Sequence, residues 1–275
     1  MALLIDEEKE KIISSQELRT ELAEDKKLPF FKSGNVHLDE LIGGFMAGDM
    51  IILGGSPKAG KTSLLQTWTR QFASQDIPCL WFSVELSHRE FLGRFGDRLP
   101  IFYLPRVLPS QTTHLWIEKK ILEAKTKFDI KVVFIDHIGM IADETMYRER
   151  NSVEILDARL ARLKQFAIAN QVCLICVAPF VAQATRKLKT EPSTGDFKGT
   201  SGIGYTADTL LGLDRNTGRQ RTVTVNEEEE SGAMVLAGSP LIATDSFLYV
   251  LDCRRSGARK IRIKLKLVDG DLLEA

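Results

Sequence analysis

Residues 54–63 read GGSPKAGKTS and directly follow the apolar run MIIL. The pattern Gly55-x4-Gly60-Lys61-Thr62 is typical of a phosphate-binding loop between a strand and a helix. In such a loop, backbone N–H groups surround the β-phosphate, the lysine neutralises β- and γ-phosphate oxygens, and the hydroxyl ligates Mg²⁺. The sequence therefore predicts a site for ATP or GTP with Mg²⁺. Its nucleotide-binding residues are Gly55, Ser56, Pro57, Lys58, Ala59, Gly60, Lys61, Thr62 and Ser63.

Two carboxylates end apolar runs further along the chain: Glu85 closes CLWFSVE and Asp136 closes KVVFID. Because the carboxyl ends of parallel strands lie at one edge of a sheet, we expect both side chains beside the loop. Asp136 can hold the hydration shell of Mg²⁺, so Thr62 and Asp136 are the predicted metal-binding residues. Glu85 can orient the water that attacks the γ-phosphate. The plainer alternatives are a solvated strand end for Asp136 and a cap on the following helix for Glu85.

Continuous apolar runs alternate with helical segments over most of the chain, which predicts an α/β fold with a mainly parallel sheet covered by helices on both faces. Residues 246–267 instead predict two strands joined near Ser256, a hairpin at the sheet edge. A short amphipathic helix within 33–49 should end at Gly43 and Gly44. The expected parallel strands lie at 50–55, 79–85, 131–136, 172–178 and 209–214.

The composition of the chain limits its function class. Lys and Arg together number 37, as do Asp and Glu, so any contact with nucleic acid must come from a local basic loop. We find neither a signal peptide nor a run of roughly 18 apolar residues that could span a membrane, and we expect a cytoplasmic protein without membrane contact. Cys173 and Cys176 lie in an apolar strand and are expected to be inert core thiols. We expect residues 1–32 to form a helical arm, solvated or docked on a neighbouring subunit, and residues 33–275 to form the core domain.

Four stretches, GDMIILGGSPKAGKTS, LWFSVELS, VVFIDHIGMI and DFKGTSGIGYTADTLLGLDR, resemble the successive motifs of the RecA-like ATPase domain of DnaB-type replicative helicases. The resemblance covers residues 33–267. It implies a RecA-like P-loop NTPase fold, ATP and Mg²⁺ as ligands, and a homo-oligomeric, hexameric ring that moves along single-stranded nucleic acid, expected to be DNA. Glu85 falls on the family's catalytic glutamate, and Lys61 keeps its role at the phosphates.

The resemblance also implies residues that act outside the chain's own nucleotide site. Arg255, in the hairpin LDCRRSGARKI, matches an arginine that reaches the next subunit's ATP and stabilises charge on the transferring phosphate. The segment ADETMYRERNS after Asp136 and the loop 185–202 match the family's nucleic-acid loops. The plainer interpretation of these charges is a solvated surface. The predicted nucleic-acid residues are Lys198, Thr200 and Gly202, which match backbone-binding positions, and Arg186, Lys187 and Lys189, which add charge.

Two departures from the family pattern bear on function. Where the family usually has a glutamine or histidine that senses the γ-phosphate, this chain has Pro179 and Phe180, whose side chains cannot hydrogen-bond a phosphate. Gln183 is a candidate substitute. We expect only an arm and no primase-binding domain before the motor segment, and therefore a minimal motor. The alternatives are a RecA- or KaiC-like ATPase that regulates or remodels without unwinding, and an ATP-gated assembly protein.

Overall fold

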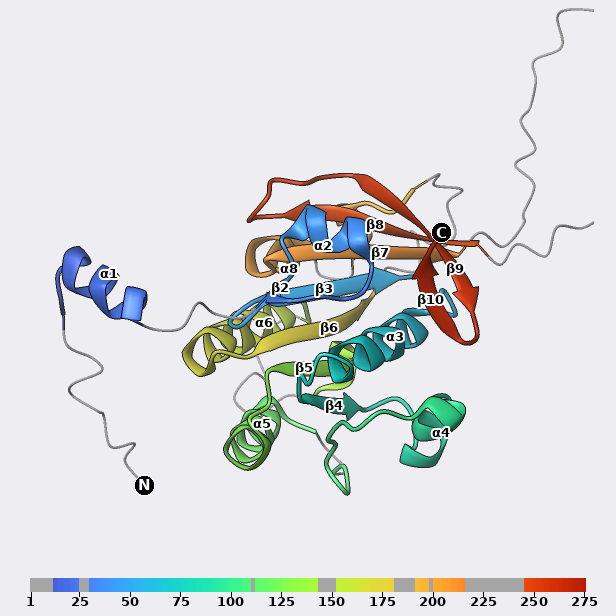
Figure 1. Cartoon of the computed structure of the whole chain (residues 1–275), viewed down its shortest axis with the longest axis horizontal. Helices are drawn as coiled ribbons and strands as arrows, with labels where there is room; N and C mark the ends of the chain where they lie inside the picture. Colours follow the sequence, from blue (N-terminus) through green and yellow to red (C-terminus); the bar gives the residue numbers. More distant parts are fainter. Residues whose placement is uncertain are drawn as a thin grey trace, which may run out of the picture.

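In the computed structural model, eight strands of the described residues form one sheet, in the order β10-β9-β8-β7-β3-β6-β5-β4 (Figure 1). The strands from β7 to β4 are parallel, and β8, β9 and β10 extend the sheet by antiparallel pairing. Their bounds are β3 Met50–Gly55, β4 Cys79–Ser83, β5 Val132–Asp136, β6 Cys173–Pro179, β7 Thr209–Arg215, β8 Asp245–Cys253, β9 Ile261–Val268 and β10 Asp271–Glu274. The structure describes residues 12–24, 30–109, 112–142, 152–180, 191–197, 200–215 and 245–275.

The prediction of a mainly parallel sheet is confirmed, because each predicted apolar run forms one of the strands β3 to β7. The C-terminal hairpin is also confirmed as β8 and β9, with Gly257 in the intervening turn at φ 69°. The hairpin does not form the edge itself, however. A further strand, β10, pairs with β9 and is the outermost strand on that side.

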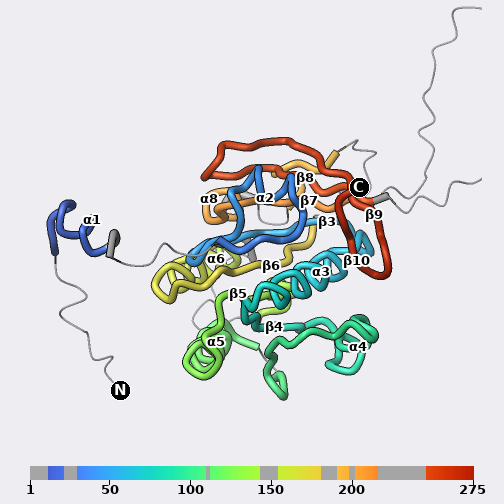
Figure 2. Tube along the Cα trace, in the orientation of Figure 1, coloured from blue at the N-terminus to red at the C-terminus, as the bar shows by residue number. Residues whose placement is uncertain are grey.

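Helices cover both faces of the sheet, as the apolar strands predict. Alternate residues of β3 divide between two buried clusters: Ile51 and Leu53 pack with residues of α2, α3 and α4. Met50 and Ile52 pack with residues of α5, α6 and α8. The tube in Figure 2 follows the chain through these elements. The bounds are α2 Val36–Ile42, α3 Lys61–Ala73, α4 His88–Gly93, α5 His114–Phe128, α6 Ser152–Asn170 and α8 Thr200–Thr206.

Two buried tryptophans fix α3 against its surroundings. Trp68 of α3 donates its indole N–H to Asn35 Oδ1 at 2.9 Å, and Trp81 of β4 donates to Thr69 Oγ1 at 2.9 Å. Both indole rings are fully buried, so each N–H needs the partner that it finds. The helix that leaves the predicted phosphate loop is therefore tied both to the N-terminal segment and to the neighbouring strand.

The N-terminal part begins with α1 (Ser15–Glu24), inside the predicted helical arm. The short strand β1 (Phe30–Phe31) pairs with β2 (Phe45–Met46), and Phe31 is fully buried in the core. The predicted amphipathic helix is confirmed as α2, which ends at Gly43 with φ 71°. The boundary at residue 33 stays a prediction.

The last strand docks on α3. The backbone N–H of Leu272 donates to Thr67 Oγ1 at 3.0 Å. Asp271 receives Arg70 Nε on one carboxylate oxygen and Arg98 Nη1 on the other, each at 2.7 Å. These contacts tie β10 to the helix that opens at the phosphate loop.

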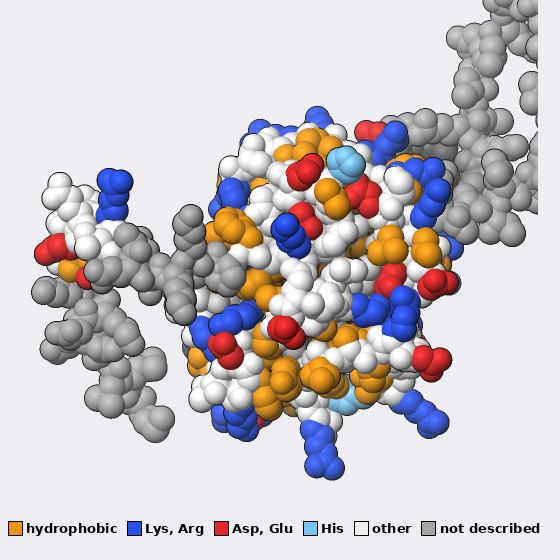
Figure 3. Space-filling model, viewed as in Figure 1, with side chains coloured by type: hydrophobic (Ala, Val, Ile, Leu, Met, Phe, Trp, Pro, Cys, Tyr) orange, Lys and Arg blue, Asp and Glu red, His pale blue; other side chains and the backbone are white. Residues whose placement is uncertain are grey.

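All four cysteines are free and buried. Burial raises the pKa of Cys176 to about 12, which keeps this thiol protonated at neutral pH, as expected for a core cysteine. Within the described ranges, no helix has the length and apolar character needed to cross a membrane. Figure 3 shows Lys and Arg interspersed with Asp and Glu over one face of the molecule, consistent with the balanced composition.

Candidate nucleotide-binding site

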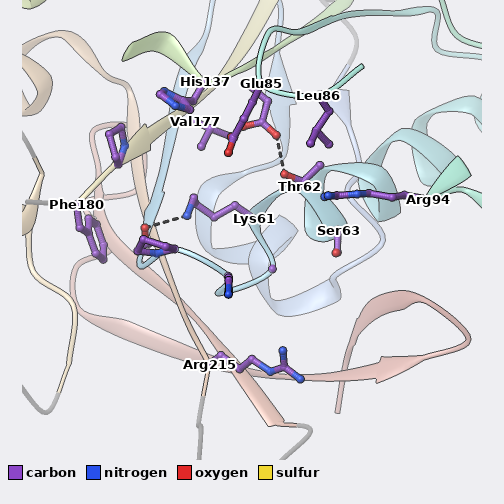
Figure 4. Close-up of a pocket in the computed structure, with 16 residues that line it drawn as sticks. Lys61, Thr62, Ser63, Glu85, Leu86, Arg94, His137, Val177, Phe180 and Arg215 are labelled. Atoms are coloured by element: carbon purple, nitrogen blue, oxygen red, sulfur yellow. Dashed lines mark hydrogen bonds between the residues drawn. The ribbon is translucent and has the colours of Figure 1, made fainter. Parts of the chain in front are cut away.

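A pocket of about 530 Å³ lies at the carboxyl edge of the sheet, where β3, β4, β5, β6 and β7 end (Figure 4). The strand register brings these ends together: Gly55 lies opposite Pro179 of β6 and Leu213 of β7, and Ser83 lies opposite Asp136. The predicted residues that line the pocket are Gly55, Pro57, Lys58, Gly60, Lys61, Thr62, Ser63, Glu85 and Asp136.

The loop between β3 and α3 follows the backbone of β7 closely. A Cβ atom at Gly55 would lie 2.5 Å from the carbonyl oxygen of Leu213, so only glycine fits there. Lys61 is the first residue of α3, and its Nζ donates to the carbonyl oxygens of Gly55 and Ser56, each at 2.9 Å. The lysine ammonium and the opening of a helix thus lie at one place, an arrangement that suits an anionic phosphate.

Thr62 and Asp136 meet across the pocket. Thr62 Oγ1 donates to Asp136 Oδ2 at 2.6 Å, and Asp136 is buried at the end of β5 (Figure 4). A hydroxyl and a carboxylate are hard oxygen donors, which Mg²⁺ prefers when it binds beside substrate phosphates. The two side chains therefore fit the predicted magnesium site, because the carboxylate lies within hydrogen-bond distance of the threonine in the first turn of α3.

Burial shifts the pKa values of Lys61 and Asp136 in opposite directions. Desolvation lowers the pKa of Lys61, and the charges of Asp136 and Glu85 partly oppose this shift. Desolvation raises the pKa of Asp136, which the hydrogen bond from Thr62 partly opposes. Both groups would gain from a ligand of opposite charge, phosphate for Lys61 and a metal cation for Asp136.

Glu85 lies two residues beyond the end of β4 and lines the pocket. Figure 4 shows its side chain on the same side of the pocket as Thr62. The following helix, α4, is capped by Ser87, whose side chain accepts the backbone N–H of Glu90 at 3.2 Å. The helix therefore already has its cap, and the alternative interpretation of Glu85 as a capping residue loses its main reason.

The wall formed by the end of β6 is apolar. Pro179 and Phe180 both line the pocket. The ring of Phe180 packs edge-on against the buried ring of Phe197, with centroids 5.1 Å apart and planes at 88°. A Cβ atom at Gly54 would lie 2.3 Å from the Phe180 ring. The aromatic side chain therefore fills the space beside Gly54 of β3, the strand that leads into the phosphate-binding loop. The position where the family has a polar γ-phosphate sensor is filled by carbon atoms.

Three basic residues that line the pocket were not among the predicted site residues: Arg94, His137 and Arg215. Arg94 follows α4 and pairs with Glu90 at 2.8 Å, and Arg215 ends β7. In the sequence, only the positions of these residues could have indicated that they line the pocket. Each lies within a few residues of a predicted strand end or of the helix that follows Glu85. A single arginine or histidine in such a place has no spacing rule that identifies it.

Arg255 lies at the opposite, amino edge of the sheet from this pocket. Its Nη1 donates to the carbonyl oxygens of Ile42 and Gly44, at 3.1 and 3.0 Å. Its Nη2 lies 2.7 and 2.6 Å from the two carboxylate oxygens of Asp49, and the guanidinium lies 5.9 Å from the ring centroid of Phe30. The predicted action of Arg255 on a neighbouring subunit's nucleotide stays a prediction.

Most of the predicted nucleic-acid residues lie outside the described ranges, namely Arg186, Lys187, Lys189 and Lys198, as does most of the segment after residue 142. Thr200 begins α8. Gly202 approaches α6 so closely that a Cβ atom there would lie 1.9 Å from Asp157 Oδ1. Close packing of two helices is thus one reason for glycine at this position, and the nucleic-acid contact stays a prediction.

The fold and the pocket define a RecA-like P-loop NTPase domain. A family model described as "DnaB-like helicase C terminal domain" matches residues 31–97. The chain is 22% identical to a replicative DNA helicase DnaB of Treponema pallidum over 238 residues, 73% of this chain and 51% of that protein. It is 24% identical to the corresponding helicase of Mycoplasma pneumoniae over 219 residues, 67% of this chain and 46% of that protein.

Solved structures agree with these sequence matches. A structure of a separate ATPase domain has a TM-score of 0.76 at 14% identity, covering 96% of this chain and 100% of that one. A structure that describes a DnaB-like replicative helicase and its interactions with primase has a TM-score of 0.72 at 15% identity. The match covers 96% of this chain and 67% of that one. The chain is thus similar to the ATPase domains of DnaB-type helicases, and it spans about half the length of the curated relatives it matches.

Proposed function

We propose that this chain is an ATP-hydrolysing motor of the DnaB helicase type, which acts on single-stranded nucleic acid in the cytoplasm as a homo-oligomeric, hexameric ring. The observation that supports this most is the meeting of Lys61, Thr62, Asp136 and Glu85 around one pocket at the carboxyl edge of the sheet. The sequence matches to replicative helicases support the same class of motor.

Each of these side chains has a task in the hydrolysis of ATP to ADP and phosphate. Lys61 would exchange its two carbonyl acceptors for β- and γ-phosphate oxygens, together with the N–H groups that open α3. Thr62 and Asp136 would hold Mg²⁺, which supplies positive charge to the phosphate oxygens. Glu85 would orient a water molecule in line with the bond to be broken.

A second candidate function is a RecA- or KaiC-like ATPase that remodels or regulates without unwinding. The apolar wall of Pro179 and Phe180 favours it, because hydrolysis is coupled to strand movement in the family through a polar side chain at that position. The two functions differ in strand separation and in the effect of nucleic acid on turnover.

The test is a measurement of phosphate release from ATP with and without single-stranded DNA, next to a strand-separation assay. The motor predicts turnover that rises with single-stranded DNA and an unwound product. Lys61→Ala should abolish both, whereas Lys119→Ala, an exposed lysine of α5, should leave both unchanged. Turnover that ignores DNA, with no strand separation, would favour the remodelling ATPase. Turnover that survives in Lys61→Ala would contradict the site itself.

A further inference from the structure

His137 is held in one orientation by the turn that follows β5. It precedes the short 3₁₀ turn Ile138–Met140, and its Nδ1 accepts the backbone N–H of Gly139 at 3.1 Å. A Cβ atom at Gly139 would lie 3.0 Å from Nδ1, so glycine leaves room for the ring. The sequence His-Ile-Gly after Asp136 thus fixes the imidazole as a cap on its own turn.

This hydrogen bond determines which ring nitrogen carries the proton. A backbone N–H can only donate, so Nδ1 is the acceptor, and the proton of the neutral ring lies on Nε2. Among the described residues, Nε2 has no hydrogen-bond partner. Within the part of the chain that the structure describes, the ring therefore keeps one donor unused.

The ring lies in the wall of the nucleotide pocket. His137 lines it together with Lys61 and Glu85 (Figure 4). Pro179 and Phe180, at the end of the adjacent strand β6, offer no hydrogen-bonding side chain. Of His137, Pro179 and Phe180, only His137 has a side chain that carries a donor.

We infer that His137 provides the contact with the γ-phosphate that Pro179 and Phe180 cannot make. Its Nε2–H donates to a γ-phosphate oxygen, a contact that ATP offers and ADP does not. His137 thereby contributes to the pocket's preference for triphosphate over diphosphate. This inference rests on the proposed function only in requiring that the pocket bind ATP.

The substitution His137→Asn separates this role from the capping role. The Oδ1 atom of asparagine can accept the N–H of Gly139 and keep the turn, as asparagine commonly does at such positions. Asparagine is too short to place a donor where Nε2 lies. His137→Gln differs in that respect, because its longer side chain places the amide nitrogen, a donor, at the Nε2 position.

The experiment measures the affinities of the full chain for ADP and for a non-hydrolysable ATP analogue, with Mg²⁺ and without nucleic acid, together with the melting temperature. In His137→Asn, the preference for the triphosphate should fall about tenfold, with ADP affinity within about twofold of wild type, as expected for one lost hydrogen bond to a charged group. The melting temperature should not change. His137→Gln should retain most of the preference.

An unchanged preference in His137→Asn, whatever its melting temperature, would overturn the inference and leave His137 as a cap of its turn. Loss of the preference in His137→Gln but not in His137→Asn would overturn it as well. Failure of the wild-type chain to bind either nucleotide would instead overturn the proposed function, and this inference with it. Lys61→Ala is the matched control, because it should weaken both nucleotides rather than the triphosphate alone.

Discussion

Arg255 binds Asp49 of the same chain through both carboxylate oxygens, at 2.7 and 2.6 Å. The same guanidinium caps the end of α2 at the carbonyl oxygens of Ile42 and Gly44. One guanidinium cannot hold these partners and also bind a phosphate in a neighbouring subunit. If Arg255 acts in trans, as the resemblance to DnaB-type helicases implies, it must first leave Asp49.

Arg255→Ala should therefore lower the stability of the chain, apart from any effect on hydrolysis. The substitution removes the arginine donor from two carbonyl oxygens and from the partly buried Asp49, which keeps the backbone N–H of Met46. This loss costs about 1–3 kcal/mol in the free energy of unfolding. Urea denaturation measures this change. Arg259→Ala removes an exposed pair with Asp252 and should cost less than about 1 kcal/mol. Equal stabilities of the two variants would show that the Arg255 contact is not maintained in solution.

Much of the fold could be predicted because the central strands are buried on both faces. Apolar runs such as 50–55 then stand out from the amphipathic helices, and their bounds follow from the turns. The strand β10 could not be predicted in this way, because four residues after a glycine turn carry no periodic signal. Its position depends on long-range contacts, chiefly Asp271 with Arg70 and Arg98.

The nucleotide site, too, could be predicted only in part. Lys61, Thr62 and Asp136 belong to motifs whose spacing is dictated by phosphate and metal geometry, and the structure places them together. Arg215 and His137 reach the pocket only because the strand order brings distant strand ends side by side. The contact of Arg255 with Asp49 was not predicted either, since the two residues lie far apart in the sequence and no motif links them.

Glu85→Gln should produce a chain that binds ATP but hydrolyses it at least about a hundredfold more slowly, because the amide has nearly the same volume and cannot act as a base. A quenched-flow or steady-state phosphate assay measures turnover, and a filter-binding assay measures retained ATP. Glu40→Gln, an exposed residue of α2, is the control and should behave as wild type. Turnover within a few-fold of wild type would exclude Glu85 as the residue that positions the water.

Joint replacement of Arg186, Lys187, Lys189 and Lys198 by alanine should weaken binding of single-stranded DNA. Each lost phosphate contact is expected to reduce the slope of log affinity against log salt by roughly 0.7, so the slope identifies how many contacts are lost. Fluorescence anisotropy at several salt concentrations gives both quantities. Replacement of Lys119, Lys120, Lys127 and Lys131, on and after α5, removes the same formal charge and is the matched control. Equal loss in the two variants would point to net charge rather than to a defined loop.

A mixture of two inactive variants tests whether the active site is shared between subunits. Arg255→Ala keeps Glu85, and Glu85→Gln keeps Arg255, so a shared interface can combine one intact residue from each variant. In a randomly mixed ring with head-to-tail interfaces, about a quarter of the interfaces would carry both intact residues. We expect each variant alone to bind ATP with little turnover, and the equal mixture to recover a measurable fraction of wild-type turnover. The assay needs proof of subunit exchange, for example by energy transfer between labelled chains. A mixture that exchanges and stays inactive, or an Arg255→Ala chain that is fully active alone, would leave Arg255 with the role that the fold itself shows, a cap on α2 bound to Asp49.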